Sequence, residues 1–354
     1  MSNRARLILL SGVGGAGTST LTAATAAALE AEGLTATVID SSATEPLEPF
    51  VVEQLNESVG RLGADIGADA LIAEAWASLP GASALSTLQR ARAALADTRS
   101  GAVVLDAGPL RAARDLVDLP AAMTRLLDAM LTPRLAMWRS NGSSGDDTLF
   151  EALSGLRLDV LRLRQMLISP ATTMRLVTTP ARDAVTRTER ALGLFAMLGV
   201  GVDGVIVNKV PRKSEGWPVA LRAEADEGVD RMRSLAAGLP VWTSTSKIRA
   251  VPKGRSALGP LGRVCVLDAE QLTVVVGDEE FTMELPLAGT ARAEARVGRQ
   301  GDQLVVAFDG GTRWIDLVPV LRRCRAVDAV RTDRGLVIRF APDPAAWRQP
   351  EVVS

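Results

Sequence analysis

The feature that most constrains this chain is a glycine-rich turn that directly follows its first apolar run. Residues 7–20 read Leu-Ile-Leu-Leu-Ser-Gly-Val-Gly-Gly-Ala-Gly-Thr-Ser-Thr, and an alanine-rich helical sequence follows from about Leu21 to Leu29. A strand, a glycine turn and a helix in this order have the shape of the Walker A phosphate-binding loop, G-x-x-x-x-G-K-S/T. Gly12 and Gly17 take the two glycine positions, so the turn predicts an anion site.

The loop keeps its glycines but lacks its lysine, because Thr18 stands at the lysine position. Backbone N–H groups and the positive end of the helix dipole attract an anion without a lysine. The lysine adds a full positive charge beside the β- and γ-phosphates, where hydrolysis needs it. We therefore expect weak binding of Mg-ATP or Mg-ADP, or none, without useful hydrolysis. The candidate nucleotide-binding residues of the loop are Gly12, Gly14, Gly15, Gly17, Thr18, Ser19 and Thr20.

Two residues are candidate Mg²⁺ ligands. Ser19 occupies the hydroxyl position of the loop, and Asp106 ends a later apolar run as the aspartate of a Walker B strand does. Asp106 is also the one catalytic candidate if the chain is active. The alternative is a glycine-rich turn with no ligand at all.

Apolar runs alternate with helical stretches over more than 200 residues. This alternation predicts an α/β domain with a doubly wound parallel sheet, whose ligands bind at the carboxyl ends of the strands. The loop and Asp106 both fall at such ends. The expected strands are Leu7–Leu10, Ala36–Ile39, Ala102–Leu105, Arg175–Thr178 and Gly204–Val207.

Composition excludes several classes of protein. A net charge of −1 gives no general attraction to nucleic acid, and no apolar run reaches the roughly 18 residues that span a bilayer. The few apolar residues before Ser11 are too short for a signal peptide, so we expect a cytoplasmic protein. The chain has no histidine, and its two cysteines, Cys265 and Cys324, are isolated, which excludes the usual zinc sites.

Taken in order, these motifs resemble the family of arsenite-pump ATPases and tail-anchored-protein-targeting ATPases. The family's loop, G-K-G-G-V-G-K-S/T-T, is similar to residues 12–20 except at Val13, Ala16 and Thr18. The resemblance implies a dimer in which the first lysine reaches the partner's nucleotide. A homodimer is what the resemblance implies, but Val13 replaces that lysine, which favours a mixed dimer in which an active relative supplies it.

The switch regions resemble the family only in part. Asp106 and Pro109 match its switch II sequence, while the polar residues between and after them do not. In switch I the family has an aspartate that orients water, and Ser42 stands there. The resemblance therefore implies a site without its water-activating carboxylate.

Two later stretches extend the resemblance. Residues 178–180 with Thr188-Glu189-Arg190 look like the family's V-T-x-P…T-E-R stretch, and residues 204–210 look like its G-V-V-V-N-R-V strand. The family's asparagine contacts adenine, which makes Asn208 a candidate for base recognition. The alternative is that Asn208 caps a strand end.

A helical subdomain is expected at about residues 120–170. Met123, Met130 and Met137 recur every seven residues, although Pro133 is expected to break any single helix there. In the targeting branch of the family this subdomain binds a client's hydrophobic helix, and methionine suits such a surface. The alternative is that the methionines fill a core between helices.

The C-terminal part predicts a small antiparallel β-sandwich. Short strands separated by glycine-containing turns begin near residue 273, and the segment resembles the small-heat-shock-like domain of bacterial arsenite-ATPase relatives. The expected division is an ATPase-like domain at 1–258, a linker at 259–262, the sandwich at 263–345 and a tail at 346–354.

Two functions follow from these motifs. The first is a nucleotide-binding subunit that does not hydrolyse ATP and pairs with an active relative. The second is a genuine ATP hydrolase that drives anion transport or delivers membrane-protein clients, with the missing charge supplied by a partner or by one of the many arginines.

Overall fold

The structure is a computed structural model of the whole chain. It describes residues 5–41, 81–97, 101–141, 147–211, 216–236, 238–245, 273–276, 281–286, 295–308, 311–332 and 335–343. Four of the sequence predictions lie outside the described residues, namely Ser42, Cys265, the linker 259–262 and the tail 346–354.

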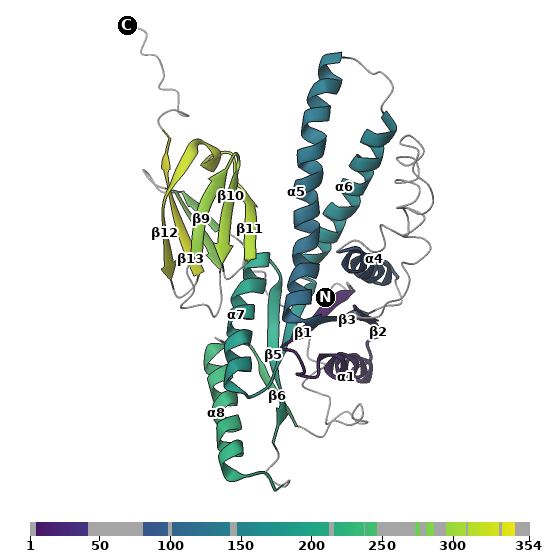
Figure 1. The fold of residues 1–354 in the computed structure, drawn as a ribbon, viewed down its shortest axis with the longest axis vertical. Helices are drawn as coiled ribbons and strands as arrows, with labels where there is room; N and C mark the ends of the chain where they lie inside the picture. Colours follow the sequence, from purple (N-terminus) through teal and green to yellow (C-terminus); the bar gives the residue numbers. More distant parts are fainter. Residues whose placement is uncertain are drawn as a thin grey trace. The chain divides into compact units, whose positions relative to one another are not determined.

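A six-stranded sheet forms the centre of the first part of the chain, in the order β2-β3-β1-β4-β5-β6 (Figure 1). β1 pairs in parallel with β3 and β4, β2 with β3, and β5 with β6. This confirms the predicted α/β fold, although β6 was not among the expected strands. The strands are β1 Arg6–Gly12, β2 Ala36–Asp40, β3 Ala102–Pro109, β4 Thr172–Thr178, β5 Gly201–Val210 and β6 Val241–Thr245.

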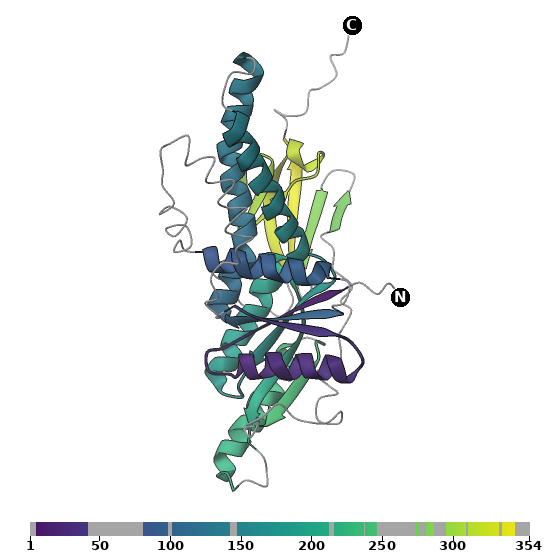
Figure 2. The same cartoon turned by 90° about the vertical axis from the view of Figure 1, so that its right-hand side faces the viewer.

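Helices cover both faces of the β1–β3 part of the sheet. Helix α1 (Thr18–Ala31) lies on one face and α4 (Ala82–Ala96) on the other (Figure 2). Residues 7–10 of β1 are therefore almost fully buried. Burial on both faces explains why these strands are continuous apolar runs rather than alternating ones.

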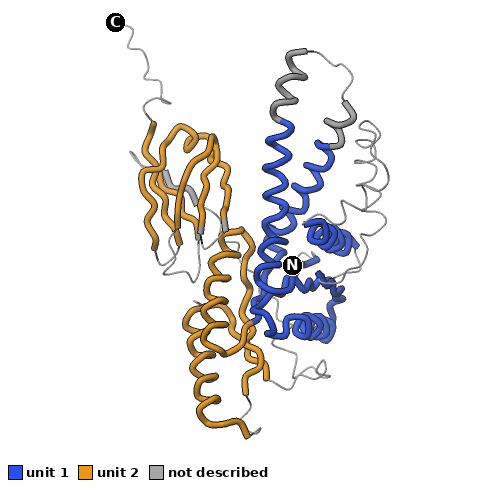
Figure 3. The backbone as a smooth tube through the Cα atoms, in the orientation of Figure 1, with its two compact units in different colours: residues 1–177, 247–265 blue, residues 178–246, 266–354 orange. Residues whose placement is uncertain are grey.

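The chain divides into two compact units (Figure 3). Unit 1 holds residues 1–177 and 247–265, with the glycine-rich loop and the long helices. Unit 2 holds residues 178–246 and 266–354, with α7 (Arg182–Leu198), α8 (Val219–Leu235) and the C-terminal strands.

Unit 1 carries a helical hairpin in which the prediction about Pro133 is wrong. Helix α5 runs unbroken from Leu110 to Asn141, through Pro120 and Pro133, and α6 (Asp147–Leu167) packs against it. A proline inside a helix costs about 3 kcal/mol. Burial of one leucine contributes about 2 kcal/mol, so a few buried residues along the hairpin offset that cost. Those residues are Leu127, Leu131, Val160 and Leu163.

The C-terminal strands form two antiparallel sheets, β11-β10-β9 and β12-β13-β8-β7. This confirms the predicted small β domain, and β12 is the strand that the sequence did not indicate. The strands are β7 Thr273–Val276, β8 Phe281–Pro286, β9 Ala295–Gln300, β10 Gln303–Phe308, β11 Gly311–Asp316, β12 Cys324–Thr332 and β13 Gly335–Pro342.

Within unit 2 the end of α7 packs against this β domain. Met197 is fully buried and belongs to the same apolar cluster as residues of β8, β10, β11 and β13. The Arg313 guanidinium on β11 donates a hydrogen bond to the carbonyl oxygen of Ala196, at 3.5 Å. The residues of this cluster that lie on those strands are Phe281, Met283, Leu285, Leu304, Val306, Ile315, Leu336, Ile338 and Phe340.

Candidate nucleotide site

The glycine-rich loop is held against the end of β4. The N–H group of Val13 donates to the carbonyl oxygen of Val177 at 3.1 Å, and the N–H group of Ala16 donates to Val13 at 2.9 Å. At Gly12 a Cβ atom would lie only 2.3 Å from the Val177 oxygen. The turn therefore has a fixed shape, and glycine is required at position 12 by this close approach.

The outer part of the loop is open. Ideal Cβ atoms built at Gly14 and Gly15 meet nothing within 4 Å, and both residues are exposed. Val13, in contrast, is buried. The apolar side chain at this position thus contributes to the packing of the loop. In the family that the sequence resembles, the lysine at the same position is expected to reach the partner's nucleotide instead.

Helix α1 begins at Thr18 without a side-chain cap. Gly17 precedes it in the left-handed conformation, with φ 91°, and the first turn contains no acidic residue. The first N–H groups of a helix have no partner within the helix and attract anions. Ser19 and Thr20 are exposed in this turn, and Thr18 is half-buried. Backbone and hydroxyl groups of the loop thus fit a phosphate group chemically.

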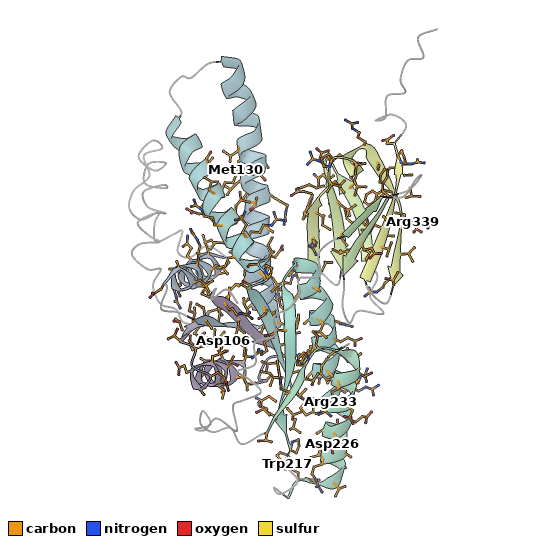
Figure 4. The ribbon with its side chains drawn as sticks, turned by 180° about the vertical axis from the view of Figure 1, so that it is seen from behind. Asp106, Met130, Trp217, Asp226, Arg233 and Arg339 are labelled. Carbon is orange, nitrogen blue, oxygen red and sulfur yellow. The ribbon has the colours of Figure 1, made fainter. Side chains whose placement is uncertain are left out.

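Asp106 lies in β3, next to β1, the strand that leads into the loop (Figure 4). Its partner across the sheet is Leu10 of β1, which lies two residues before Gly12, the first glycine of the loop. The carboxylate is buried, and its Oδ1 accepts a hydrogen bond from the N–H group of Gly108 at 2.9 Å. This bond fixes the orientation of the carboxylate within β3, three residues before the strand ends at Pro109.

Ser11 is a residue of this region that the sequence analysis did not single out. Its side chain is buried, and its hydroxyl donates to the carbonyl oxygen of Gly108 at 2.9 Å. The start of the loop and the turn after Asp106 are therefore joined by a hydrogen bond. A serine before the first loop glycine gives no signal in the sequence, because the partner lies 97 residues away.

The end of β2 lies beside Asp106 of β3. Asp40 pairs with Asp106 across the two strands, and the N–H group of Ser41 donates to the Asp106 carbonyl oxygen at 3.0 Å. The following residue, Ser42, is the predicted replacement for a water-orienting aspartate. It lies outside the described residues, so that prediction stays untested.

Asn208 is in unit 2, near the carboxyl end of β5. Its side chain is buried, and Lys209 beside it is exposed and has a positive φ of 61°. The regular pairing of β5 with β6 is interrupted between Val207 and Val210. Sequence analysis selected Asn208 but did not predict the irregular backbone at this position.

The predicted methionine stripe divides between two environments. On α5, Met130 is 47% exposed and Leu126 is 62% exposed, while Leu127 and Leu131 are buried against the hairpin. Figure 4 shows Met130 on this helix. The stripe is therefore partly surface and partly core, and the side chain of Met137 lies outside the described residues.

Thr188 of the T-E-R stretch is buried on α7. Its hydroxyl donates to the carbonyl oxygen of Ala184, one turn earlier, at 2.8 Å. Such a bond within a helix accounts for a buried threonine hydroxyl without a ligand.

Metal chemistry at this site would rest on few protein ligands. The described residues contain no group of three or more acidic, cysteine or histidine side chains that could hold a metal ion. Mg²⁺ bound with a nucleotide needs only one or two protein oxygens, because phosphates and water supply the others. The Ser19 hydroxyl and the Asp106 carboxylate are oxygen ligands of the type that such a Mg²⁺ ion needs. Among the helices in the described ranges, none is long and apolar enough to cross a membrane.

A parallel α/β sheet with a glycine-rich turn between its central strand and the next helix defines the class of P-loop proteins. The chain matches the anion-transporting ATPase family over residues 31–217 and an HSP20-like domain found in ArsA over residues 278–340. This chain therefore belongs to the anion-transporting ATPase family, with an HSP20-like domain near its C-terminus.

The chain is also similar to individual proteins of three bacteria. The uncharacterized protein SCO2128 of Streptomyces coelicolor is 26% identical over 97% of this chain and 99% of its own length. Protein Rv2184c of Mycobacterium tuberculosis is 25% identical over 77% of this chain and 71% of its own length. A putative arsenical pump-driving ATPase of Aquifex aeolicus is 24% identical over 58% of this chain and 63% of its own length.

Proposed function

We propose that this chain binds Mg-ATP or Mg-ADP through the backbone of its glycine-rich loop and hydrolyses ATP poorly or not at all. The observation that carries the proposal is the open, uncapped start of α1, where Thr18 stands in place of the lysine. Helix and loop N–H groups supply attraction for phosphate. No lysine in this loop supplies the charge that stabilises the departing γ-phosphoryl group.

The proposed roles of the residues follow from this chemistry. The N–H groups of the loop bind phosphate oxygens, the Ser19 hydroxyl and the Asp106 carboxylate hold Mg²⁺, and Asn208 reads the base. Mg²⁺, when bound, neutralises phosphate charge. Asp106 is then a metal-positioning residue, since its carboxylate is already oriented by the Gly108 N–H group.

The test is calorimetric titration of the purified chain with Mg-ATP and Mg-ADP, repeated on Thr18→Lys. The restored lysine is expected to strengthen binding about tenfold, or ~1.4 kcal/mol, because it adds a cation beside the phosphates. Ser19→Ala should weaken binding only when Mg²⁺ is present. Absence of heat from both the wild-type chain and Thr18→Lys, at concentrations that reveal millimolar affinity, would overturn the proposal.

A genuine hydrolase is the second candidate. The buried and hydrogen-bonded Asp106 favours it, because a strand-end aspartate of this kind serves hydrolysis as well as binding. It predicts steady ATP turnover that Asp106→Asn and Ser19→Ala abolish. Turnover that both variants retain would come from a contaminant and would count against this candidate.

We further propose partners of two kinds. The first is an active relative, because Val13 cannot make the lysine contact across a dimer. Measuring the molecular mass of the chain in solution, by itself and mixed with that relative, distinguishes self-dimers from mixed dimers. The second is an apolar helix of a client, favoured by the exposed Leu126 and Met130 on α5. Photo-crosslinking from position 130 to a model apolar helix tests that contact.

A further inference from the structure

The start of the glycine-rich loop lies opposite a β-bulge in β3. Leu10 of β1 pairs with Asp106 of β3, and the next pair joins Gly12 to Pro109. One residue of β1 thus stands opposite two residues of β3. A bulge of this kind interrupts the regular ladder of hydrogen bonds and changes the direction of the side chains beside it. Asp106 is the last residue of β3 that pairs with β1 before the bulge, so the groups that close the bulge also influence its carboxylate.

Ser11, the β1 residue opposite the bulge, closes it with its side chain. The Ser11 hydroxyl donates to the Gly108 carbonyl oxygen at 2.9 Å, and the Gly108 N–H group donates to Oδ1 of Asp106 at 2.9 Å. The two polar backbone groups of Gly108 are therefore bonded to these two side chains. Gly108 has a φ of 70°, a conformation that glycine adopts readily. Ser11 is fully buried, so bulk water does not reach its hydroxyl.

The Asp106 carboxylate has one oxygen that this arrangement leaves for a ligand. Asp106 is buried, and in the described part of the chain only its Oδ1 atom accepts a hydrogen bond. A buried carboxylate oxygen without a partner is unfavourable, and a bound cation removes that penalty. The backbone of Asp106 is held from β2 as well, because its carbonyl oxygen accepts the N–H group of Ser41 at 3.0 Å. With the backbone and Oδ1 both held, the position of Oδ2 is fixed too.

We propose that Ser11 is a positioning residue for Mg²⁺ binding: by holding Gly108, its hydroxyl keeps Oδ2 of Asp106 available to the cation. This inference rests on the proposed binding of Mg-nucleotide, and it concerns the metal rather than the phosphates. Ser11 does not itself ligate the cation in this role. Loss of a group that orients a metal ligand typically weakens metal binding about 10-fold to 100-fold. A serine that only closed the bulge would affect stability and not the metal.

The experiment measures how much Mg²⁺ strengthens ADP binding to the full chain. Calorimetric titration with ADP in Mg²⁺ and again in EDTA gives two affinities, and their ratio is the Mg²⁺ enhancement. Ser11→Ala is expected to lower the Mg²⁺ enhancement about tenfold, in the same direction as Asp106→Asn, because the carboxylate loses its fixed orientation. Its affinity for ADP in EDTA should stay within about twofold of the wild-type value, since the backbone donors of the loop remain.

Thr172→Val is the matched control for the loss of a buried hydroxyl. Thr172 is buried at the start of β4, the end of the strand away from the loop, and its hydroxyl donates to the carbonyl oxygen of Met166 at 2.6 Å. The control removes a bond of the same kind, so the melting temperature should fall in both variants. The Mg²⁺ enhancement of Thr172→Val should stay within about twofold of the wild-type value, because the site is distant.

The outcomes separate this inference from the proposed function. An unchanged Mg²⁺ enhancement in Ser11→Ala would overturn the inference, and so would an equal fall in Thr172→Val. A Ser11→Ala protein that loses ADP affinity equally in Mg²⁺ and in EDTA would show damage to the loop and would also overturn it. ADP binding by the wild-type chain that does not depend on Mg²⁺ would overturn the inference and leave nucleotide binding intact. If neither the wild-type chain nor Thr18→Lys binds ADP, the proposed function fails with it.

Ser11→Cys is the reserve variant if Ser11→Ala does not fold. The thiol is close in size to the hydroxyl group but is a weak hydrogen-bond donor. The Mg²⁺ enhancement of Ser11→Cys should therefore fall below the wild-type value, with the affinity for ADP in EDTA preserved. A folded Ser11→Cys protein with the full wild-type enhancement would contradict the positioning role.

Discussion

At the scale of single residues, the glycine-rich loop depends on how closely its first glycine approaches β4. The Val177 carbonyl oxygen accepts the N–H group of Val13 and leaves no space for a side chain at Gly12. Neighbouring loop glycines face open space instead. Of Gly12, Gly14 and Gly15, only Gly12 is therefore required by a close contact within the fold.

We predict that Gly12→Ala destabilises the protein by about 1–3 kcal/mol, because its Cβ atom would lie 2.3 Å from the Val177 oxygen and the strands must shift. Gly14→Ala is the matched control. Its Cβ atom would meet nothing within 4 Å, so the expected change is within about 0.5 kcal/mol. Urea denaturation measures both. Equal stability of the two variants would contradict the described loop packing.

A second residue-scale prediction concerns Arg299 on β9. Its guanidinium donates to the carbonyl oxygens of Gly301 and Arg322, at 2.8 and 2.6 Å, and to that of Cys324. Lysine cannot reproduce this fork of donors, so Arg299→Lys should destabilise the β domain by about 1–2 kcal/mol. Both arginines are exposed, so the comparison tests the hydrogen bonds: Arg296→Lys, on the same strand, should change stability by less than about 0.5 kcal/mol. Thermal unfolding of both variants tests the difference.

The sequence indicated some of these residues and could not indicate others. Thr18 and the glycines of the loop follow from a local pattern, and so does Asp106 at the end of an apolar run. The bond from Ser11 to Gly108 and the positive φ of Lys209 depend on segments that are distant in the sequence. Local patterns contain no information about such partners.

At the scale of elements, the helical hairpin shows that tertiary packing can outweigh the low helix propensity of a residue. Pro133 lies inside α5, although proline disfavours a helix interior, because packing against α6 compensates for the lost hydrogen bond. Strand β12 was missed because most of its residues are exposed, and charged residues interrupt its apolar ones. Strand β6 was missed because its five residues, Val-Trp-Thr-Ser-Thr, are mostly polar. The expected strands were found where burial makes a segment apolar.

The base of the hairpin predicts a pH dependence of stability. Burial raises the pKa of Asp118, a shift that Arg125 and Arg114 partly oppose. The folded protein therefore retains a proton that the unfolded chain releases near pH 3.9. Stability contributed by this group falls as the pH rises from the unfolded pKa through the folded pKa.

Asp118→Asn removes this titration, so its stability should fall less than that of the wild-type chain as the pH rises from about 4. Urea denaturation at several pH values up to 7 measures the difference. The loss of attraction between the ionised carboxylate and Arg125 and Arg114 adds an opposing effect. A comparison at about pH 3 is the reference, because there the unfolded chain's carboxyl group, whose pKa is near 3.9, is mostly protonated, and so is the folded one, whose pKa is higher. Stability curves that stay parallel over the whole range would show that burial of Asp118 is not the source.

At the scale of the whole molecule, the β domain includes a residue from the ATPase-like part of the chain. Met197, at the end of α7, is fully buried in the apolar cluster of the β domain. Met130, on α5, is 47% exposed. Substitution of the two methionines therefore compares the loss of the same side chain at a buried and at a partly exposed position.

We predict that Met197→Ala lowers the free energy of unfolding by about 2–5 kcal/mol, through a cavity in the shared core. Met130→Ala is the control and should change it by less than about 0.5 kcal/mol. Denaturant titration of both variants, followed by circular dichroism, gives the values. A Met197→Ala protein as stable as the control would mean that α7 and the β domain do not share a core.

The packing of α7 against the β domain also limits how the protein can be divided into fragments. A chain cut at the expected boundary after residue 258 would expose the Met197 side chain and leave the Ala196 carbonyl oxygen without the Arg313 guanidinium. The shortened protein would carry an exposed apolar surface at the end of α7 that is buried in the intact molecule. Self-association of such a fragment would be a product of the cut and would say nothing of the natural assembly.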